Sequence, residues 1–209
     1  MVTDRLPRGT FVVVSGPPAS GKTTLARAVA PALGLPLIAK DTIKEALMTV
    51  LPAPDVAASR VVGRASVAAL LAVAAESGGA VLESVWHRSY ALDDLRSLPG
   101  PVVEVFCRCD PVLAASRYAM RAGSRDAGHL DAERMTGELR NDEVARPVAG
   151  GWPVIEVDTA CPVDVAALIE AIRAAAGTGP PGLNGLVGEV RAPIASPGGR
   201  RPPASGYRR

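Results

Sequence analysis

The chain has 209 residues, of which 48% are hydrophobic but only 3% aromatic, so it can bury one sizeable core built mainly from alanine, valine and leucine. Its formal charge is +2, but five arginines and one glutamate in residues 177–209 leave residues 1–176 with a net charge of −2. A mildly acidic body argues against a broad nucleic-acid interface, which needs a basic face.

The termini and the cysteines indicate a cytoplasmic protein that does not engage a membrane. Residues 1–5 lead into a strand rather than an apolar signal sequence, and residues 65–75 are too short and too rich in alanine to span a bilayer. Cys107, Cys109 and Cys161 are odd in number and lack Cys-x-x-Cys spacing, which favours reduced thiols. Cys107 and Cys109 are two apart on a predicted strand and share a face, and simple packing is favoured for this pair over metal or redox use.

Short apolar runs alternate with helix-like segments along the chain. We expect strands at residues 11–15, 35–38, 80–84, 102–109 and 152–158, and helices at about 22–33, 41–47, 55–76, 91–98, 111–122, 131–145 and 162–176. Pro31 should kink or shorten the first helix, and Pro36 suits an edge strand. The alternation predicts a parallel α/β sheet, with its ligands at the carboxyl ends of the strands.

Residues 1–176 form the predicted domain, and residues 177–209 form a predicted disordered tail. The tail holds 6 prolines and 8 glycines and shows no apolar periodicity. A functional basic tail is the alternative interpretation.

The most specific motif follows the first strand and has the pattern Gly-x-x-x-x-Gly-Lys-Thr. It is typical of the phosphate-binding loop of nucleotide-binding proteins, in which backbone N–H groups and a helix N-terminus surround phosphate oxygens. Lys22 would reach the β- and γ-phosphates, and the Thr23 hydroxyl would bind Mg²⁺. The predicted nucleotide-binding residues are Gly16, Pro17, Pro18, Ala19, Ser20, Gly21, Lys22, Thr23 and Thr24.

Lys40 and Asp41 follow the second predicted strand. A carboxylate here could accept the proton of an attacking hydroxyl, as a kinase base does, but Asp41 is an equally good helix N-cap. The chain has 20 arginines and only three lysines, at positions 22, 40 and 44. Retention of lysine here suggests ammonium chemistry, although solvated charges at a helix start explain Lys40 and Lys44 as well.

The third predicted strand ends near Glu83, which could anchor Mg²⁺ or could be a buried acid paired with an arginine. Trp86, His87 and Arg88 come next, where an acceptor substrate would lie. An ordinary surface loop is an equally good interpretation of these three residues.

Arg117, Arg121 and Arg125 are spaced by four residues, and Arg117 and Arg121 share one helix face. Such arginines could stabilise the charge of a transferring phosphoryl group, and the polar break at residues 123–128 would let the segment close. A solvated basic face is the alternative. His129 is interpreted as structural.

The chain resembles the small P-loop kinases that include chloramphenicol phosphotransferase, zeta-toxin kinases, gluconate kinases and polynucleotide kinase domains. It is similar above all to ATP-binding proteins with an AAA domain that are described as kinases. The resemblance spans about residues 10–176. The segments that carry it are residues 16–26, Lys40-Asp41-Thr42-Ile43-Lys44-Glu45, Val81-Leu82-Glu83-Ser84, Arg117-x-x-x-Arg121 and residues 154–159.

The resemblance implies a nucleoside-monophosphate-kinase-like α/β/α fold with a five-stranded parallel sheet and a short helical lid. It also implies that Asp41 is the catalytic base, that Arg117 and Arg121 face the ATP phosphates, and that the loop from Thr159 borders the adenine. One departure is Glu83, because that strand often ends in aspartate. Glutamate reaches about one methylene further, which puts its role as an Mg²⁺ anchor in question.

We therefore expect an ATP- and Mg²⁺-dependent kinase that phosphorylates a hydroxyl of a small acceptor. Lys22, Asp41, Arg117 and Arg121 would be catalytic, Thr23 and Glu83 would bind the metal, and Thr159 would contact the nucleotide. The acceptor would meet Lys40, Asp41, Glu83, Trp86, His87 and Arg88. Two alternatives are an ATP-binding regulator without a small acceptor and a polynucleotide 5′-hydroxyl kinase.

Overall fold

A computed structural model describes residues 6–122 and 142–177, with the side chains of residues 121 and 122 left out. Its strands are β1 (Phe11–Ser15), β2 (Leu37–Ala39), β3 (Ala80–Glu83), β4 (Val102–Arg108) and β5 (Val154–Asp158). Its helices are α1 (Lys22–Leu33), α2 (Lys40–Met48), α3 (Val56–Glu76), α4 (Arg88–Arg96), α5 (Pro111–Ala122) and α7 (Val165–Gly177). Strands and helices alternate through most of the described chain, as the sequence predicts.

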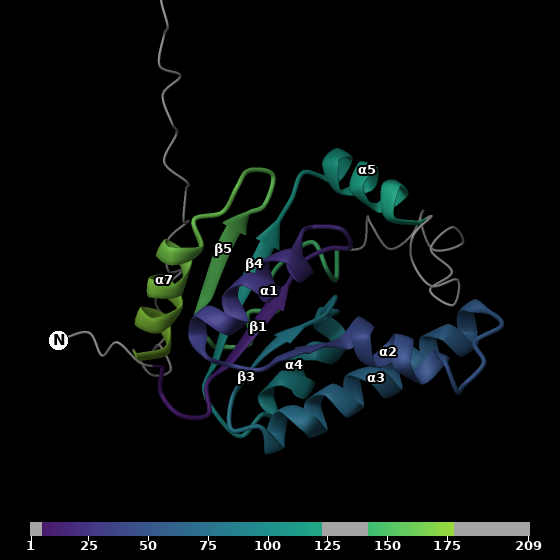
Figure 1. Cartoon of the computed structure of the whole chain (residues 1–209), viewed down its shortest axis with the longest axis horizontal. Coiled ribbons are helices and arrows are strands. Elements are labelled where there is room, and N and C mark those ends of the chain that lie inside the picture. Colours follow the sequence, from purple (N-terminus) through teal and green to yellow (C-terminus); the bar gives the residue numbers. More distant parts are fainter. Residues whose placement is uncertain (1–5, 123–141, 178–209) are drawn as a thin grey trace, which may run out of the picture.

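The five strands form one parallel sheet with the order β2-β3-β1-β4-β5. β1 lies in the centre, with Val14 opposite Glu83 of β3 and Val105 of β4. β2 is an edge strand that begins just after Pro36, as expected for a residue that cannot donate to a strand ladder. Because all strands run in one direction, their carboxyl ends meet at one edge of the sheet, and α5 lies beyond that edge (Figure 1).

Helices cover both faces of the sheet and create two apolar cores (Figure 1). On one face, α1 and α7 pack against the sheet through a cluster that includes Leu25, Val29, Leu168 and Ile172. On the other face, the cluster draws on α3 and α4 and includes Leu70, Ala74, Ala91 and Leu95. Aliphatic side chains fill most of both cores, with Phe11 and Trp86 in the second. Helices on both faces of the sheet confirm the predicted three-layer α/β/α architecture.

Several predicted boundaries differ from the structure. α1 continues through Pro31 to Leu33 and ends at Gly34, whose left-handed backbone (φ 68°) closes the last turn. The prediction of an early end was wrong, because Pro31 lies in the final turn of the helix and interrupts few backbone bonds. Residues 142–145, the end of the predicted helix at 131–145, form a turn. The rest of that helix, Arg125, His129 and the tail beyond residue 177 lie outside the described residues.

α3 covers the residues predicted for it, but the membrane argument considered only residues 65–75 of this apolar helix. It has 21 residues and a mean hydropathy of 1.6 in its most apolar window, so by length and composition it could cross a membrane. Residues 65–75 were judged too short to span a bilayer, but the helix that contains them is long enough. Core helices of soluble proteins pass the same test, and α3 contributes Val62, Leu70 and Ala74 to the buried interior.

Candidate active site

The loop between β1 and α1 has the backbone of a phosphate-binding loop. Gly16 and Gly21 adopt φ values of 134° and 84°, in the region that glycine tolerates best, as the motif predicts. Ala19 also has a positive φ, of 60°, which the loop motif does not predict for a residue with a side chain. Alternation of such angles turns successive N–H groups toward one centre, which makes the loop a cradle for an anion at the N-terminus of α1.

Gly16 is required by packing as well as by its backbone angle. A Cβ atom at this position would lie 2.6 Å from the carbonyl oxygen of Cys107 in β4 and 2.9 Å from the Oγ of Ser20. The loop therefore starts pressed against the neighbouring strand, with no space for a side chain.

Gly16→Ala is expected to destabilise the fold by about 2–5 kcal/mol through backbone strain and overpacking, and to abolish nucleotide binding. Gly34→Ala is the matched control, since Gly34 also has a positive φ (68°) but its Cβ would meet nothing within 4 Å. That control should cost about 1 kcal/mol and leave nucleotide affinity unchanged. Denaturant unfolding and nucleotide titration measure both effects, and equal losses in the two variants would contradict the packing argument.

Two polar side chains inside the loop fit a bound phosphate. Lys22 is only 5% exposed, and its ammonium donates to the carbonyl of Pro17 at 2.6 Å, so the cation is held within the loop. The hydroxyl of Ser20 is fully buried and has no hydrogen-bond partner among the described residues. Because a buried hydroxyl without a partner is costly, this group suits a ligand oxygen.

Glu83 lies at the end of β3, beside the start of α1. Its side chain is 6% exposed, accepts a hydrogen bond from the Thr23 hydroxyl, and feels the charges of Lys22, Asp41 and Lys40. Burial raises the pKa of Glu83 above its ordinary value of 4.5, and the positive charge of Lys22 partly opposes that shift. Among residues 6–120 and 142–177, no arginine contributes to this shift of the Glu83 pKa, in contrast to the interpretation of Glu83 as an acid buried against arginine.

Thr23 and Glu83 form a donor set suited to Mg²⁺, which binds oxygen ligands and usually keeps several waters beside substrate phosphates. Within residues 6–122 and 142–177, no group of three or more His, Cys, Asp or Glu side chains could hold a metal ion without other ligands. The residues present therefore fit a metal that arrives with a nucleotide better than one in a closed protein site.

Asp41 lies next to this pair because β2 pairs with β3. Ala39, the last residue of β2, is opposite Glu83, and α2 begins directly after it. Asp41 is about half exposed, and its Oδ1 lies 3.1 Å from the ammonium of Lys40. The alternative role of Asp41 as an N-cap is wrong, because Ala39 occupies the N-cap position and Asp41 lies in the first turn.

Trp86, His87 and Arg88, which were expected to line the acceptor site, lie in three different environments. Trp86 is 3% exposed and belongs to the apolar core, so it does not form a surface loop. His87 is the N-cap residue of α4, and Arg88 is the first residue of that helix, which starts three residues before its predicted start. The guanidinium of Arg88 donates to the carbonyl of Pro147 at 2.7 Å. In this structure Arg88 therefore holds the segment after residue 142.

The N-terminus of α4 is bound by a residue far away in the sequence. The Glu143 carboxylate accepts a hydrogen bond from the Ser89 N–H at 2.7 Å, and this bond lowers the pKa of Glu143. The backbone carbonyl of the same residue accepts from the Arg88 N–H at 3.2 Å. A carboxylate at a helix N-terminus stabilises the helix, which explains its earlier start.

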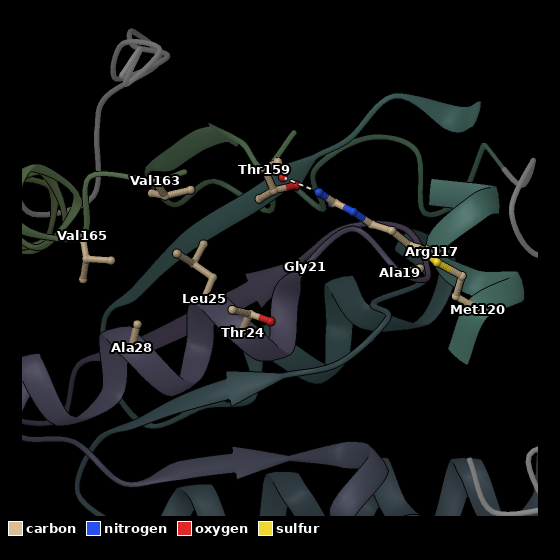
Figure 2. Close-up of a pocket in the computed structure, with 10 residues that line it drawn as sticks. All are labelled: Ala19, Gly21, Thr24, Leu25, Ala28, Arg117, Met120, Thr159, Val163 and Val165. Atoms are coloured by element: carbon tan, nitrogen blue, oxygen red, sulfur yellow. Dashed lines mark hydrogen bonds between the residues drawn. The ribbon is translucent and has the colours of Figure 1, made fainter. Parts of the chain in front are cut away.

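A cavity of about 570 Å³ lies beside the phosphate loop, between α1, α5 and the loop after β5. Figure 2 shows Arg117 extending from α5 to Thr159, with Thr24, Leu25 and Ala28 of α1 below them in this view. Arg117 donates to the Thr159 carbonyl at 3.1 Å. The cavity is lined by Ala19, Gly21, Thr24, Leu25, Ala28, Arg117, Met120, Thr159, Val163 and Val165.

Thr159 binds the phosphate loop directly. Its hydroxyl lies 2.6 Å from the Ser20 carbonyl and 2.9 Å from that of Arg108, so the loop after β5 packs against the loop after β1. Arg117 lines this cavity beside the phosphate loop, and its role at the ATP phosphates stays a prediction. The side chain of Arg121 is not among those described.

Two more charged side chains are fully buried. For Lys44 this excludes the interpretation as a solvated charge at a helix start, and Glu104 was not singled out in the sequence analysis. Lys44 is fully buried on α2 and donates to the Ser59 hydroxyl of α3 at 2.7 Å. Glu104 is fully buried in the middle of β4. An acid within the apolar run Val102-Val103-Glu104-Val105 was a visible signal, because a charge is rarely buried without partners.

A family model described as an AAA domain matches residues 11–143. The match covers more than half of the chain and includes the phosphate loop, Asp41, Glu83 and Arg117. The chain belongs to this AAA-domain family. No curated protein matches it significantly.

Solved structures show the same fold. A proposed kinase from Chloroflexus aurantiacus J-10-fl is 27% identical, with a TM-score of 0.69 over 79% of this chain and 97% of that one. A gluconokinase from Sinorhizobium meliloti 1021 is 24% identical, with a TM-score of 0.53 over 83% and 92% of the two chains. The APS kinase of Mycobacterium tuberculosis, solved with AMPPNP and APS, is 20% identical, with a TM-score of 0.54 over 82% and 99%. The sheet, the phosphate loop and these likenesses confirm the predicted P-loop kinase fold for this member of the AAA-domain family.

Proposed function

We propose that the chain is an ATP-dependent phosphotransferase that moves the γ-phosphoryl group to a hydroxyl of a small-molecule acceptor. The observation that carries the proposal is the grouping of Lys22, Thr23, Glu83 and Asp41 at one edge of the sheet, where Glu83 interacts with the other three. A cation for phosphate, a metal-binding pair and a half-exposed carboxylate are the parts that phosphoryl transfer requires. The likeness to a proposed kinase at 27% identity agrees with this interpretation.

In this proposal the phosphate loop and Lys22 bind the phosphates of ATP. The cavity beside Arg117 and Thr159 receives the adenine ring. Thr23 and Glu83 would hold Mg²⁺, which neutralises charge on the phosphate oxygens. Asp41 accepts the proton of the acceptor hydroxyl as that oxygen bonds to the γ-phosphorus. The bond from the γ-phosphorus to its bridging oxygen breaks, and ADP leaves. Lys40, 3.1 Å from Asp41, orients that carboxylate.

A small acceptor is favoured over a polynucleotide because residues 1–176 carry a net charge of −2. Binding of a nucleic-acid strand depends mainly on cationic contacts with phosphates and weakens steeply with salt. The acidic body supplies no such surplus of positive charge.

The experiment that tests the proposal is ADP release from Mg·ATP by purified protein, with and without a deproteinised extract of small metabolites. The expected result is a large stimulation by the extract that is lost in Lys22→Met. Short single-stranded oligonucleotides provide a parallel arm. Stimulation by oligonucleotides alone, with strong salt sensitivity, would replace the small acceptor with a polynucleotide, and no stimulation by either would refute the transferase.

A further inference from the structure

Glu104 is a buried carboxylate that the proposed reaction does not use. It lies in the middle of β4 opposite Val13 of β1, with no exposed surface. By the alternation of side chains along a strand, it shares the sheet face of Val102, which packs in the core beneath α3 and α4. Burial of a charged group in such a core is costly unless partners satisfy it.

Four donors satisfy the Glu104 carboxylate, two on each oxygen. Oε1 accepts from the Ser15 hydroxyl at 2.6 Å and from the Val148 N–H at 2.8 Å. Oε2 accepts from the Ala149 N–H at 2.9 Å and from the indole N–H of Trp152 at 3.1 Å. Hydrogen bonds to an ionised acceptor are stronger than neutral ones, so this carboxylate is a firm junction between β1, β4 and residues 148–152.

Residues 148–152 are shaped to meet Glu104. Ala149 has a positive φ of 51°, which turns its N–H and that of Val148 toward one acceptor. A Cβ atom on Gly150 would lie 2.2 Å from the ring of Trp152 and 2.8 Å from Leu92, so only glycine fits there. The strain and the close packing show a segment built around the carboxylate.

The remaining partner, Ser15, connects this junction to the phosphate loop. Ser15 is the last residue of β1 and is bonded directly to Gly16, the first residue of the loop. The carbonyl of Cys107, three residues after Glu104 on the same strand, contacts Gly16 from the side. β4 therefore holds the start of the loop at two points, through one side chain and one carbonyl.

We propose that Glu104 is a positioning residue for nucleotide binding, acting through Ser15 on the start of the phosphate loop. The carboxylate fixes Ser15 relative to residues 148–152, and this sets the direction in which the chain enters the cradle. The inference rests on nucleotide binding by the loop, which is part of the proposed function, and does not depend on transfer to an acceptor.

The test compares Ser15→Ala with Ser66→Ala by titration with Mg·ATP and with ADP. Ser66 is a matched control, since its hydroxyl is also fully buried and donates to the Val62 carbonyl at 2.7 Å, but within α3. We expect Ser15→Ala to bind nucleotide about tenfold more weakly, the low end of the range for loss of one hydrogen bond to a charged group. Ser66→Ala should bind with unchanged affinity, so that a loss confined to Ser15→Ala separates positioning of the loop from removal of a buried hydroxyl in general.

A double-mutant cycle with Glu104→Gln tests whether Ser15 acts through Glu104. In the Glu104→Gln background, Ser15→Ala should cause a smaller further loss of affinity, because the amide oxygen left to accept from Ser15 carries no charge. If Glu104→Gln does not fold, the comparison of the two serine variants decides the question alone.

Three outcomes would overturn the inference: unchanged nucleotide affinity in Ser15→Ala, equal losses in Ser15→Ala and Ser66→Ala, or additive losses in the cycle. A protein that shows the expected affinities but transfers no phosphate would refute the proposed transferase and leave this inference intact. The two proposals therefore fail on different measurements.

Discussion

Replacing Asp41 with asparagine should reduce phosphoryl transfer on the order of 10³-fold, within the range that a positioned general base contributes. Asparagine keeps the size and most of the polarity of aspartate but cannot accept the hydroxyl proton. Asp41 lies in the first turn of α2, outside the phosphate loop. The affinity for Mg·ATP should therefore stay within about twofold of the wild-type value. The measurement is acceptor-dependent ADP release, with nucleotide affinity determined separately by titration.

Glu45→Gln is the matched control for Asp41→Asn. Glu45 lies one helical turn later on α2 and is exposed, so its replacement removes the same unit of charge from the same helix. It should leave the rate of transfer nearly unchanged. If Asp41→Asn transfers phosphate at the wild-type rate, or if both variants slow it equally, Asp41 is not the base.

The sequence was sufficient wherever a motif is local or where parallel-strand geometry applies. The phosphate loop is one continuous segment, so its glycines and Lys22 could be assigned from spacing alone. Glu83 and Asp41 are 42 positions apart, yet both follow parallel strands, and β2 and β3 turned out to be neighbours. Their proximity was therefore predictable from the rule that ligands lie at the carboxyl ends of such strands.

Side-chain direction and long-range partners were not predictable in the same way. Trp86 follows β3 as expected but turns into the core, because position along the chain does not say which way a side chain points. α4 begins early because Glu143 binds its N-terminus from more than 50 residues away. Glu104 was not singled out as an acid in an apolar strand, and its four donors come from β1 and residues 148–152, which only tertiary packing brings together.

Replacing Glu83 with glutamine should lower the rate of transfer on the order of 100-fold, because the amide brings no negative charge to the metal. The loss should depend on Mg²⁺, with more metal needed to reach half-maximal rate. Glu156→Gln is the matched control, since Glu156 is a strand acid on β5 and is not among the groups that interact with Glu83. Initial rates over a range of Mg²⁺ concentrations give the comparison.

The raised pKa of Glu83 also predicts how Glu83→Gln changes stability. Without metal, the substitution should not destabilise the fold even though it lowers the rate of transfer. Burial raises this pKa in the folded state above 4.5, so the folded state holds the proton of Glu83 more tightly than the unfolded state does. As the pH rises from 4.5 through the raised pKa, the folded state must ionise a buried group, and the free energy of unfolding falls by linkage. Glu83→Gln removes that cost, so at neutral pH and without Mg²⁺ the variant should be at least as stable as the wild type.

The same pKa predicts how the wild-type rate depends on pH. Only the ionised carboxylate binds Mg²⁺ well. On acidification, Mg²⁺-dependent activity should therefore fall at a higher pH than it would for an ordinary glutamate with a pKa of 4.5. Higher Mg²⁺ should move this fall to lower pH, because metal and proton compete for one group. A variant that is less stable than the wild type at neutral pH, or an acid limb that Mg²⁺ does not move, would show that Glu83 is a structural acid rather than a metal ligand.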